Sequence, residues 1–344
     1  MTGALGTKAG RFKLLGLVVA IAAGWSVPYV FSNYQVSLTT LILISAMLAT
    51  SINFMAGNVG LVSVGHAGIA ATAGYGLAWS FAQGHGLGTQ LLIALALTLV
   101  ASFVFGLTSM RTSGIFFLMA TLALGMVVFG LSYRMSAITG GENGLSGIRR
   151  PELFSSYWMY YFLVLVVFVV VTAAIWVVTR SPFGTALRGI RESESRMESL
   201  GYNVAAYKLG AMMISGVVAG ISGVLSVWLM EFVSPASAGF LRSALATLMV
   251  ILGGVGTFLG PLTGATIVSW IEHVLSTYIE RWPTVLGLIF IVVIVFAPDG
   301  IGGAVRAWWQ GRRRRSDREV ARSSGSAVSA DMARSPGGSQ GTAE

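Results

Sequence analysis

Residues 180–208, RSPFGTALRGIRESESRMESLGYNVAAYK, form a long charge-dense segment between two strongly apolar runs at 159–178 and 209–230. Ser181-Pro182 is typical of a helix N-cap followed by proline at the first helical position. Apolar residues then recur every three or four positions, and charged residues fall largely on other faces. The spacing therefore predicts a short amphipathic helix, broken once, in a loop between two membrane spans. Its apolar positions are Phe183, Leu187, Ile190, Met197 and Leu200.

The end of this helix and its use can be predicted as well. Gly201 is a predicted C-cap, and Asn203 is placed to cap the helix that follows. A charged amphipathic segment of this kind suits docking against another protein. The residues alone leave two alternatives open, because such a segment can also be a solvated connector or a helix lying on the lipid surface.

Composition outside this segment indicates a membrane protein. Apolar residues make up 55% of the 344 residues and charged residues only 10%, whereas a soluble domain has about 25% charged residues. The charges are clustered, which leaves several runs of about 18–22 residues long enough to span a bilayer as helices. The runs are continuous rather than alternating, which disfavours a β-barrel. The fold class predicted is all-α, a polytopic transmembrane helical bundle.

The apolar runs divide the chain into about ten hydrophobic spans, and a single membrane domain is expected over 14–300. The glycine-rich runs near 60–82 and 243–279 are expected to be broken or re-entrant. Residues 1–13 form an N-terminal arm, and the Ser-, Gly-, Ala- and Arg-rich tail at 311–344 is predicted to be disordered. The predicted spans are 14–31, 37–56, 60–82, 90–109, 114–133, 158–178, 208–230, 243–258, 261–279 and 283–298.

Basic residues predict the orientation of these spans. If the N-terminus lies inside, 17 of the 22 Lys and Arg residues fall in inner segments and five in outer ones. Basic residues concentrate in cytoplasmic loops, so both termini and the segment 180–208 are predicted to be cytoplasmic. Aromatic residues that open one span are expected to be interfacial anchors; these are Tyr157, Trp158, Tyr160 and Tyr161.

Two glycine-spaced stretches look alike, GNVGLVSVGHAG at 57–68 and GGVGTFLGPLTG at 253–264. Close helix packing is the favoured interpretation, and a few of their residues are expected to line a substrate path. The outer loop holds a third glycine-rich stretch, TGGENGLSG at 139–147. Spacing favours a plain turn there, although its backbone amides could also hold a polar zwitterion.

Chemistry-bearing motifs are scarce in this sequence. There is no cysteine, and three scattered histidines give no metal-ligand spacing, so no metal site is predicted. No catalytic residue is predicted either, because the hydrolase, zinc-protease and nucleotide-binding motifs are missing. If ATP drives this protein, another subunit must bind the ATP. Within the spans, Glu272-His273 is the candidate acid–base pair that an ion-coupled carrier would need.

Taken together, several motifs resemble the membrane permease subunit of ABC importers for branched-chain amino acids, and most of all its M-type (LivM-type) subunit. The resemblance covers roughly 40–300, and the order and spacing of the motifs make it specific. Arg149-Arg150 departs from the family pattern, which more often has a single basic residue beside proline. The matching stretches are TGGENGLSGI at 139–148, SPFG at 181–184, ALRGIRE at 186–192, LGYNV at 200–204, YK at 207–208, FVSP at 232–235, GGVG at 253–256, GP at 260–261 and APDG at 297–300.

The resemblance implies a non-enzymatic permease subunit in a prokaryotic plasma membrane, one half of a path for Leu, Ile or Val. It implies a second homologous permease, two ATP-binding subunits that use ATP and Mg, and an extracytoplasmic binding protein. No cofactor is expected in this chain. Relatives of the same architecture move urea or short amides, so those solutes stay an alternative. An ion-coupled secondary carrier is the second alternative.

Carried over by position, the resemblance assigns the residues of the docking loop. Within 180–208, Gly184 and Gly201 would shape the loop, while Arg188, Arg191 and Glu192 would meet the ATPase. Residues expected along the substrate path are Ser63, His66, Thr139 and Asn143.

Overall fold

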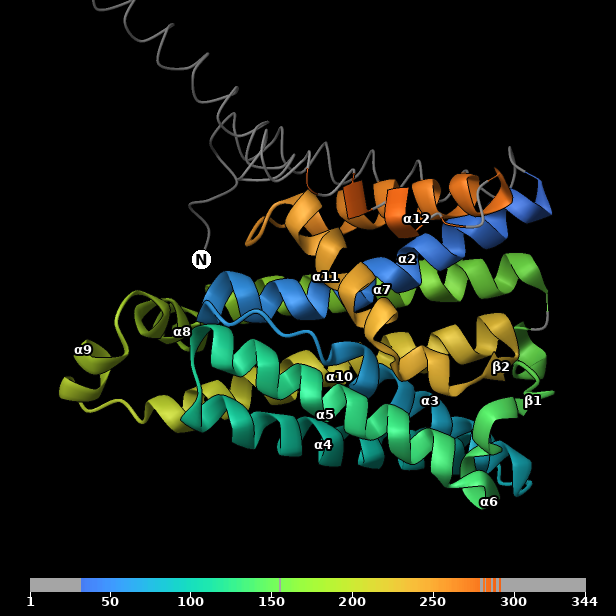
Figure 1. Ribbon diagram of the computed structural model, residues 1–344, viewed down its shortest axis with the longest axis horizontal. Helices are drawn as coiled ribbons and strands as arrows, with labels where there is room; N and C mark the ends of the chain where they lie inside the picture. Colours follow the sequence, from blue (N-terminus) through green and yellow to red (C-terminus); the bar gives the residue numbers. More distant parts are fainter. Residues whose placement is uncertain are drawn as a thin grey trace, which may run out of the picture.

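The structure, a computed structural model, describes residues 32–154 and 156–278 together with 281, 283–285, 287, 288 and 291. Within these residues it is an all-α bundle of long, roughly parallel and antiparallel helices (Figure 1). The helices are α2 (Asn33–Phe54), α3 (His66–Ala82), α4 (Leu87–Arg111), α5 (Gly114–Arg134), α6 (Ser136–Thr139), α7 (Tyr157–Arg180), α8 (Pro182–Glu192), α9 (Glu194–Ser199), α10 (Val204–Met230), α11 (Phe240–Gly253) and α12 (Gly260–Tyr278).

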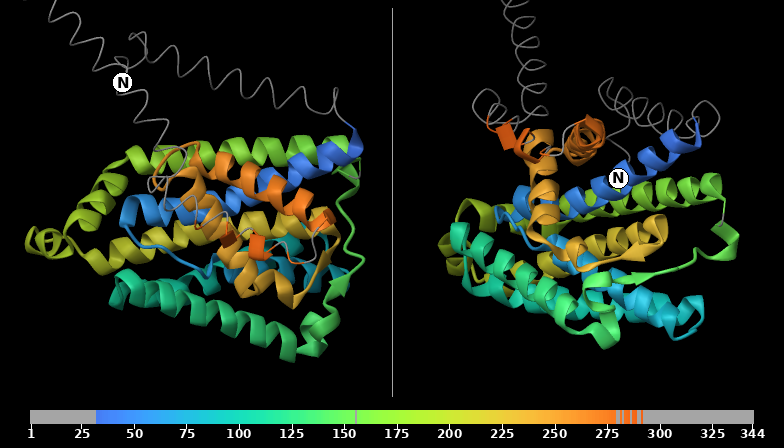
Figure 2. Two further views of the ribbon diagram at one scale, coloured as in Figure 1. Left: turned by 45° about the horizontal axis from the view of Figure 1, so that its top comes forward. Right: turned by 45° about the vertical axis from the view of Figure 1, so that its right-hand side comes forward.

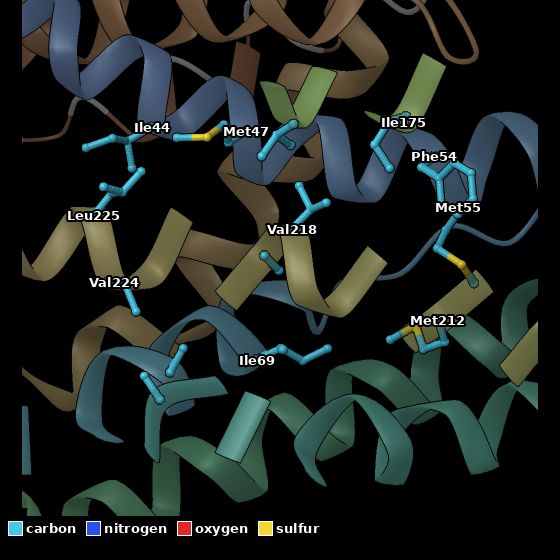
Figure 3. Close-up of a cluster of buried hydrophobic side chains, with 14 of the residues drawn as sticks. Ile44, Met47, Phe54, Met55, Ile69, Ile175, Met212, Val218, Val224 and Leu225 are labelled. Atoms are coloured by element: carbon cyan, nitrogen blue, oxygen red, sulfur yellow. The ribbon is translucent and has the colours of Figure 1, made fainter. Parts of the chain in front are cut away.

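The long helices pack side by side across the bundle. α12 packs on α2, α2 packs on α7 and α10, and α10 packs on α3 and α4, with α5 at the far side (Figures 1 and 2). The core lies where α2, α3, α7 and α10 meet. Figure 3 shows Met47 of α2, Ile69 of α3 and Val218 of α10 in this buried cluster. The outer helices α4, α5 and α7 keep large apolar side chains exposed, as helices facing lipid do.

Five of the described helical segments are long and apolar enough to cross a membrane. They are Asn33–Val59, Leu87–Arg111, Gly114–Arg134, Tyr157–Arg180 and Val204–Met230. They agree with five of the predicted spans, so a multi-pass helical membrane bundle is established. The predicted arm at 1–13, the span at 14–31 and the tail at 311–344 lie outside the described residues, as does most of 283–298.

The predicted span at 60–82 is wrong at its start. α2 runs on into a π-helix, η1 (Met55–Val59), which ends at Gly60 in the left-handed conformation with φ 80°. Residues 60–65 are not helical, and α3 begins only at His66. Glycine permits this turn because it lacks the Cβ that would strain a positive φ.

The two predicted spans at 243–258 and 261–279 are likewise separated by a non-helical stretch at 254–259. α11 has 14 residues. At roughly 1.5 Å per residue it is only about 21 Å long, shorter than the roughly 30 Å hydrocarbon core. α11 therefore cannot cross a bilayer as a straight helix by itself. The total of ten spans and the re-entrant character of these segments stay predictions.

The two ends of the bundle are built differently (Figure 1). At one end lie α8 and α9, so we call it the α8–α9 end. At the other end, β1 (Leu145–Ser146) pairs antiparallel with β2 (Phe232–Val233), with Leu145 opposite Val233. We call this the ribbon end; it also holds the 3-10 turns η2 (Gly141–Asn143), η3 (Glu152–Phe154) and η4 (Pro235–Ala238).

Candidate functional site

The local signals predicted for 180–208 are confirmed. The Ser181 hydroxyl accepts a hydrogen bond from the Gly184 amide at 3.3 Å, with Pro182 at the first helical position. The helix breaks once, at Ser193, which caps α9 by accepting from the Arg196 amide. Gly201 is left-handed with φ 85°, and the Asn203 side chain caps α10 through the Ala206 amide at 3.1 Å. The segment is therefore a helix–break–helix with defined ends.

α8 packs its apolar face on the bundle and leaves its charged face exposed. Leu187 and Ile190 are buried, whereas Arg188 and Glu192 are exposed. The Arg188 guanidinium donates to the Thr179 carbonyl at 2.7 Å, at the end of α7. Gly184 has no room for a side chain, because a Cβ there would lie 2.4 Å from the Thr179 oxygen. α8 is thus held tightly against the end of α7.

The prediction that Leu200 lies on the apolar face of the segment is wrong. Leu200 is 68% exposed, because α9 ends at Ser199 and Leu200 lies in the C-cap turn rather than on a helix face. Met197 is buried and packs on Gly189, where a Cβ would lie 2.7 Å from its sulfur. This contact folds α9 back onto α8.

An ion pair between a buried lysine and a partly exposed glutamate, which sequence reasoning missed, ties α9 to α10. The Lys208 Nζ lies 2.7 Å from the Glu194 Oε1, and the lysine side chain is only 3% exposed. Phe183 of α8 stacks on Tyr207, with ring centroids 5.3 Å apart. A signal was available, because Lys208 is a charged residue inside the first turns of an apolar helix, where an isolated charge is costly. The pair and the stack fix 182–203 to the bundle.

Arg191 makes a contact inside the chain. Its guanidinium donates to the Gly57 carbonyl at 2.5 Å. Its side chain also packs on Gly60, where a Cβ would lie 2.9 Å from the arginine Cγ. The residue expected to meet a partner therefore links α8 to the π-helix and the non-helical stretch between α2 and α3.

The two similar glycine stretches contact each other, which confirms that they pack closely. A Cβ on Gly57 would lie 2.6 Å from the Gly256 Cα, so backbone meets backbone. Asn53 joins the same two segments, because its side chain accepts from the Gly256 amide at 2.7 Å and donates to the Thr257 carbonyl at 3.0 Å. Together with Arg191, these bonds form a continuous contact from α8 to residues 254–259. We call it the glycine joint: Asn53, Gly57, Arg191, Gly256 and Thr257.

His66 and Ser63, predicted on the substrate path, are fully buried at the start of α3. The His66 ring makes two hydrogen bonds. Its Nδ1 lies 2.8 Å from the Ser63 hydroxyl, and its Nε2 lies 2.7 Å from the Ser215 hydroxyl. Ser215 donates its own proton to the Ser51 carbonyl at 2.7 Å. It must therefore accept from His66, which places the imidazole proton on Nε2. This chain of bonds joins α2, α3 and α10.

Thr139 and Asn143 lie at the ribbon end, away from Ser63 and His66. The Thr139 hydroxyl donates to the Ser132 carbonyl at 2.6 Å and accepts from the Gly141 amide. Gly140, Gly141, Gly144 and Gly147 all have positive φ, so the favoured interpretation of 139–147 as a turn is confirmed. Asn143 is exposed, and among the described residues its side chain has no hydrogen-bond partner.

Arg150, noted only as a departure from the family pattern, closes the ribbon end. Its guanidinium donates to the Trp228 and Leu229 carbonyls at 2.7 and 3.0 Å, at the end of α10. It also lies 4.8 Å from the Tyr160 ring centroid and 3.7 Å from the Glu231 carboxylate. Tyr160 and Tyr161 are each 1% exposed, so the prediction that they are interfacial anchors is wrong. They belong to the core.

A cavity of about 340 Å³ lies between α2, α3 and α10 and is bounded at the ribbon end by β2, η4 and the start of α11. Small and aliphatic residues such as Ala70, Gly74 and Val227 form its buried walls, and Arg242 lies at its exposed rim. None of Ser63, His66, Thr139 and Asn143 lines it. The structure thus brings Ser63 and His66 together but joins neither to Thr139 or Asn143.

The membrane-length helices define a multi-pass helical membrane protein, in which α8 and the cavity are the features that could carry a function. The chain belongs to the family described as "Branched-chain amino acid transport system / permease component", whose model matches residues 14–298.

Named relatives agree with this family. The chain is 29% identical over 319 residues to the "High-affinity branched-chain amino acid transport system permease protein LivM" of Salmonella typhimurium and of Escherichia coli, covering 85% of this chain and 74% of each relative. It is 27% identical over 284 residues to the "Autoinducer 2 import system permease protein LsrC" of Yersinia pestis, covering 78% and 75%. A solved structure titled "PsaBC from Streptococcus pneumoniae in complex with Fab" shares 17% identity and covers 74% of this chain and 94% of that one, with a TM-score of 0.33, too low to support an argument.

Proposed function

We propose that this chain is the permease subunit of an ATP-driven importer and forms half of the translocation pathway for branched-chain amino acids. The family and the LivM relatives support the solute class. The observation that carries the proposal is α8, a helix packed rigidly on the bundle with an exposed charged face. Such a face, on a permease component with no nucleotide-binding motif of its own, fits a separate ATPase.

The proposed assembly contains this chain, a second homologous permease, two ATP-binding subunits that use ATP and Mg, and an extracytoplasmic binding protein. The α8–α9 end faces the cytoplasm, both termini are cytoplasmic, and the membrane is a prokaryotic plasma membrane. The distribution of Lys and Arg supports this orientation. About ten spans, with α3 and α11 as shorter or re-entrant pieces, complete the membrane domain.

Movement of α8 would pass to the glycine joint. Gly184 and Arg188 hold α8 to the end of α7, and Gly201 sets the turn behind α9. Arg188 and Glu192 present the exposed face to the ATPase, and Arg191 transmits its displacement to the Gly57 carbonyl. ATP-driven closure of the partner would thereby shift the pathway between two access states. The proposed path residues are still Ser63, His66, Thr139 and Asn143, although none of them lines the cavity.

The test reverses charge on α8 without touching the glycine joint. Arg188→Glu with Glu192→Lys should lower co-purification of the ATP-binding subunits and reduce ATP-driven leucine uptake by about tenfold or more. Because Arg188→Glu also removes the bond to the Thr179 carbonyl, Glu192→Lys alone, which keeps that bond, should lower both in the same direction. Arg191 is left unchanged, because its variant would also break the bond to Gly57. Pull-down, ATPase activity and uptake in proteoliposomes supply the three measurements.

Arg111→Glu is the matched control. Arg111 is an exposed arginine in the last turn of α4, at the same end of the bundle, and is not part of α8. It should leave co-purification and uptake within about twofold of the unchanged protein. If the α8 double variant shows normal coupling, or if the Arg111 variant loses as much uptake, then 180–208 is a solvated connector and does not dock on the ATPase.

Two other functions remain as alternatives with their own signatures. Urea or a short amide would be the solute if it, rather than leucine, were taken up by the same assembly. An ion-coupled carrier would need no ATPase and would depend on Glu272, which is half-buried in α12. Its neighbour His273 hydrogen-bonds to Tyr34. Uptake that stops without the ATPases but survives Glu272→Gln supports the importer.

A further inference from the structure

The cavity at the ribbon end has an unusual set of free polar groups. Hydroxyls of Ser45, Ser226, Ser234 and Ser237 line it, and none of them has a hydrogen-bond partner among the described residues. In contrast, Thr40, Thr50 and Thr98 in the packed helices donate to the carbonyl four residues earlier. Polar groups in a partly enclosed space are usually hydrogen-bonded. These hydroxyls are therefore available to a ligand or to water.

Charge in the cavity is of one sign. Arg242 is the basic residue of its wall, and no Asp or Glu lines it. The Arg242 guanidinium has no acidic or carbonyl partner within the part of the chain that the structure describes. It lies in the first turn of α11, where the helix dipole disfavours a cation. Its position therefore costs α11 some stability and leaves an unpaired guanidinium at the cavity rim.

The remaining wall is aliphatic. Leu41, Ile44 and Leu48 of α2 face Ala67, Ala70 and Ala71 of α3, with Val227 of α10 alongside. A volume of about 340 Å³ lies at the lower end of the range for small-molecule sites. A solute that fits this cavity is small, has an aliphatic part and carries an anionic group.

We infer that this cavity holds the transported amino acid in the membrane and that Arg242 binds its carboxylate. The inference rests on the proposed function and adds the specificity-determining residue. The guanidinium forms a bidentate pair with the carboxylate, and the aliphatic side chain packs on the alanines of α3. The free serine hydroxyls accept from the ammonium group. A solute without a carboxylate, such as an amide, loses the contact with Arg242.

The absence of cysteine in the whole sequence makes a direct binding test available. Ser226→Cys places a single thiol on the cavity wall, and Ser146→Cys places one on the exposed ribbon outside it. The full permease complex in lipid vesicles is treated with a thiol reagent and increasing leucine or leucinamide. Leucine should slow labelling at 226 and not at 146, and leucinamide should protect at least tenfold less well.

Arg242 is then changed in the Ser226→Cys background. Arg242→Gln should raise the leucine concentration needed for protection by about 10- to 100-fold, the value of a lost charged hydrogen-bond pair, and leave protection by leucinamide unchanged. Arg242→Lys should recover part of the effect. Arg149→Gln is the matched control, because Arg149 is exposed at the same end and does not line the cavity.

The outcomes separate this inference from the proposed function. If unchanged protein takes up leucine with ATP but leucine does not protect residue 226, the cavity is not the holding site and the inference is wrong. Equal loss of protection by leucine and leucinamide in Arg242→Gln would likewise overturn the carboxylate contact. If unchanged protein shows no ATP-driven leucine uptake, the proposed function fails, whatever the labelling shows.

Discussion

The two ends of the bundle differ in how their interior is filled. Toward the α8–α9 end the glycine joint brings backbone against backbone at Gly57 and Gly256, and Asn53 and Arg191 hold it with hydrogen bonds. Toward the ribbon end, α2, α3 and α10 part around a cavity of about 340 Å³, and four serine hydroxyls on its wall have no hydrogen-bond partner among the described residues. Small residues thus give close backbone packing at the glycine joint and a cavity at the ribbon end.

The difference shows what glycine and serine do in different surroundings. Glycine removes side chains, so two segments approach until their backbones touch. Serine removes bulk too, but its hydroxyl needs a partner and keeps the space polar. The structure is therefore closely packed at the joint and hollow near the ribbon.

Filling the joint should produce the largest effect. Gly57→Val places a Cβ where only 2.6 Å separates it from the Gly256 Cα, and backbone cannot move aside as a flexible side chain can. We expect a loss of about 3 kcal/mol or more in unfolding free energy, the upper part of the range for overpacking. Thermal unfolding in detergent, followed by tryptophan fluorescence, measures it.

Gly130→Val is the control for this prediction. Gly130 is also helical, and a Cβ there meets nothing within 4 Å. Gly130→Val should lower the unfolding free energy by no more than about 1 kcal/mol, the scale of differences in helix propensity. Equal destabilisation by the two variants would mean that the joint is not a close backbone contact.

A serine in each region gives the second comparison. Ser215→Ala removes the acceptor of the His66 Nε2 proton and leaves a fully buried donor unpaired. The expected loss is about 1–3 kcal/mol. Ser226→Ala removes a cavity hydroxyl that has no partner among the described residues, so stability should change by less than about 0.5 kcal/mol. A larger loss in Ser226→Ala than in Ser215→Ala would contradict the contrast between packed and hollow regions.

Among the three packed contacts tested, at Gly57, Ser215 and Arg150, the smallest loss is expected at Arg150 of the ribbon end. Arg150→Lys keeps the charge but loses the planar group that donates to Trp228 and Leu229 carbonyls and lies over Tyr160. We expect a loss of about 1 kcal/mol. Arg149→Lys, at an exposed position, should show no change. The same thermal unfolding assay compares them, and identical melting would leave Arg150 without a stabilising function.

Sequence reasoning predicted features that depend on neighbours along the chain. Ser181, Pro182, Gly201 and Asn203 act as the caps that local rules expect. Five long helices agreed with five apolar runs for the same reason, since length and hydropathy are local properties. The break before His66 was anticipated in kind, but its position depends on the left-handed turn at Gly60, which hydropathy does not record.

Contacts between distant segments could not be predicted in this way. The similarity of 57–68 and 253–264 was visible, but their meeting at Gly57 and Gly256 depends on how α2 packs on α12. Arg191 was expected to face a partner because it is charged; its additional bond to a carbonyl beside the π-helix could not be predicted from the sequence. Arg242 was counted only as an outer basic residue. Its place at the cavity follows from the turn through β2 and η4, which brings the start of α11 to the space bounded by α2, α3 and α10.

The touching glycines at 57 and 256 have a mechanical consequence. Two surfaces without side chains resist being pressed together, but they do not interlock, so nothing on them must be unmeshed before one slides along the other. The hydrogen bonds of Asn53 and the packing of α2 on α11 and α12 limit such sliding between the two segments. The contact is therefore stiff under compression, whereas its resistance to shear comes from the bonds and helices beside it rather than from the glycines themselves.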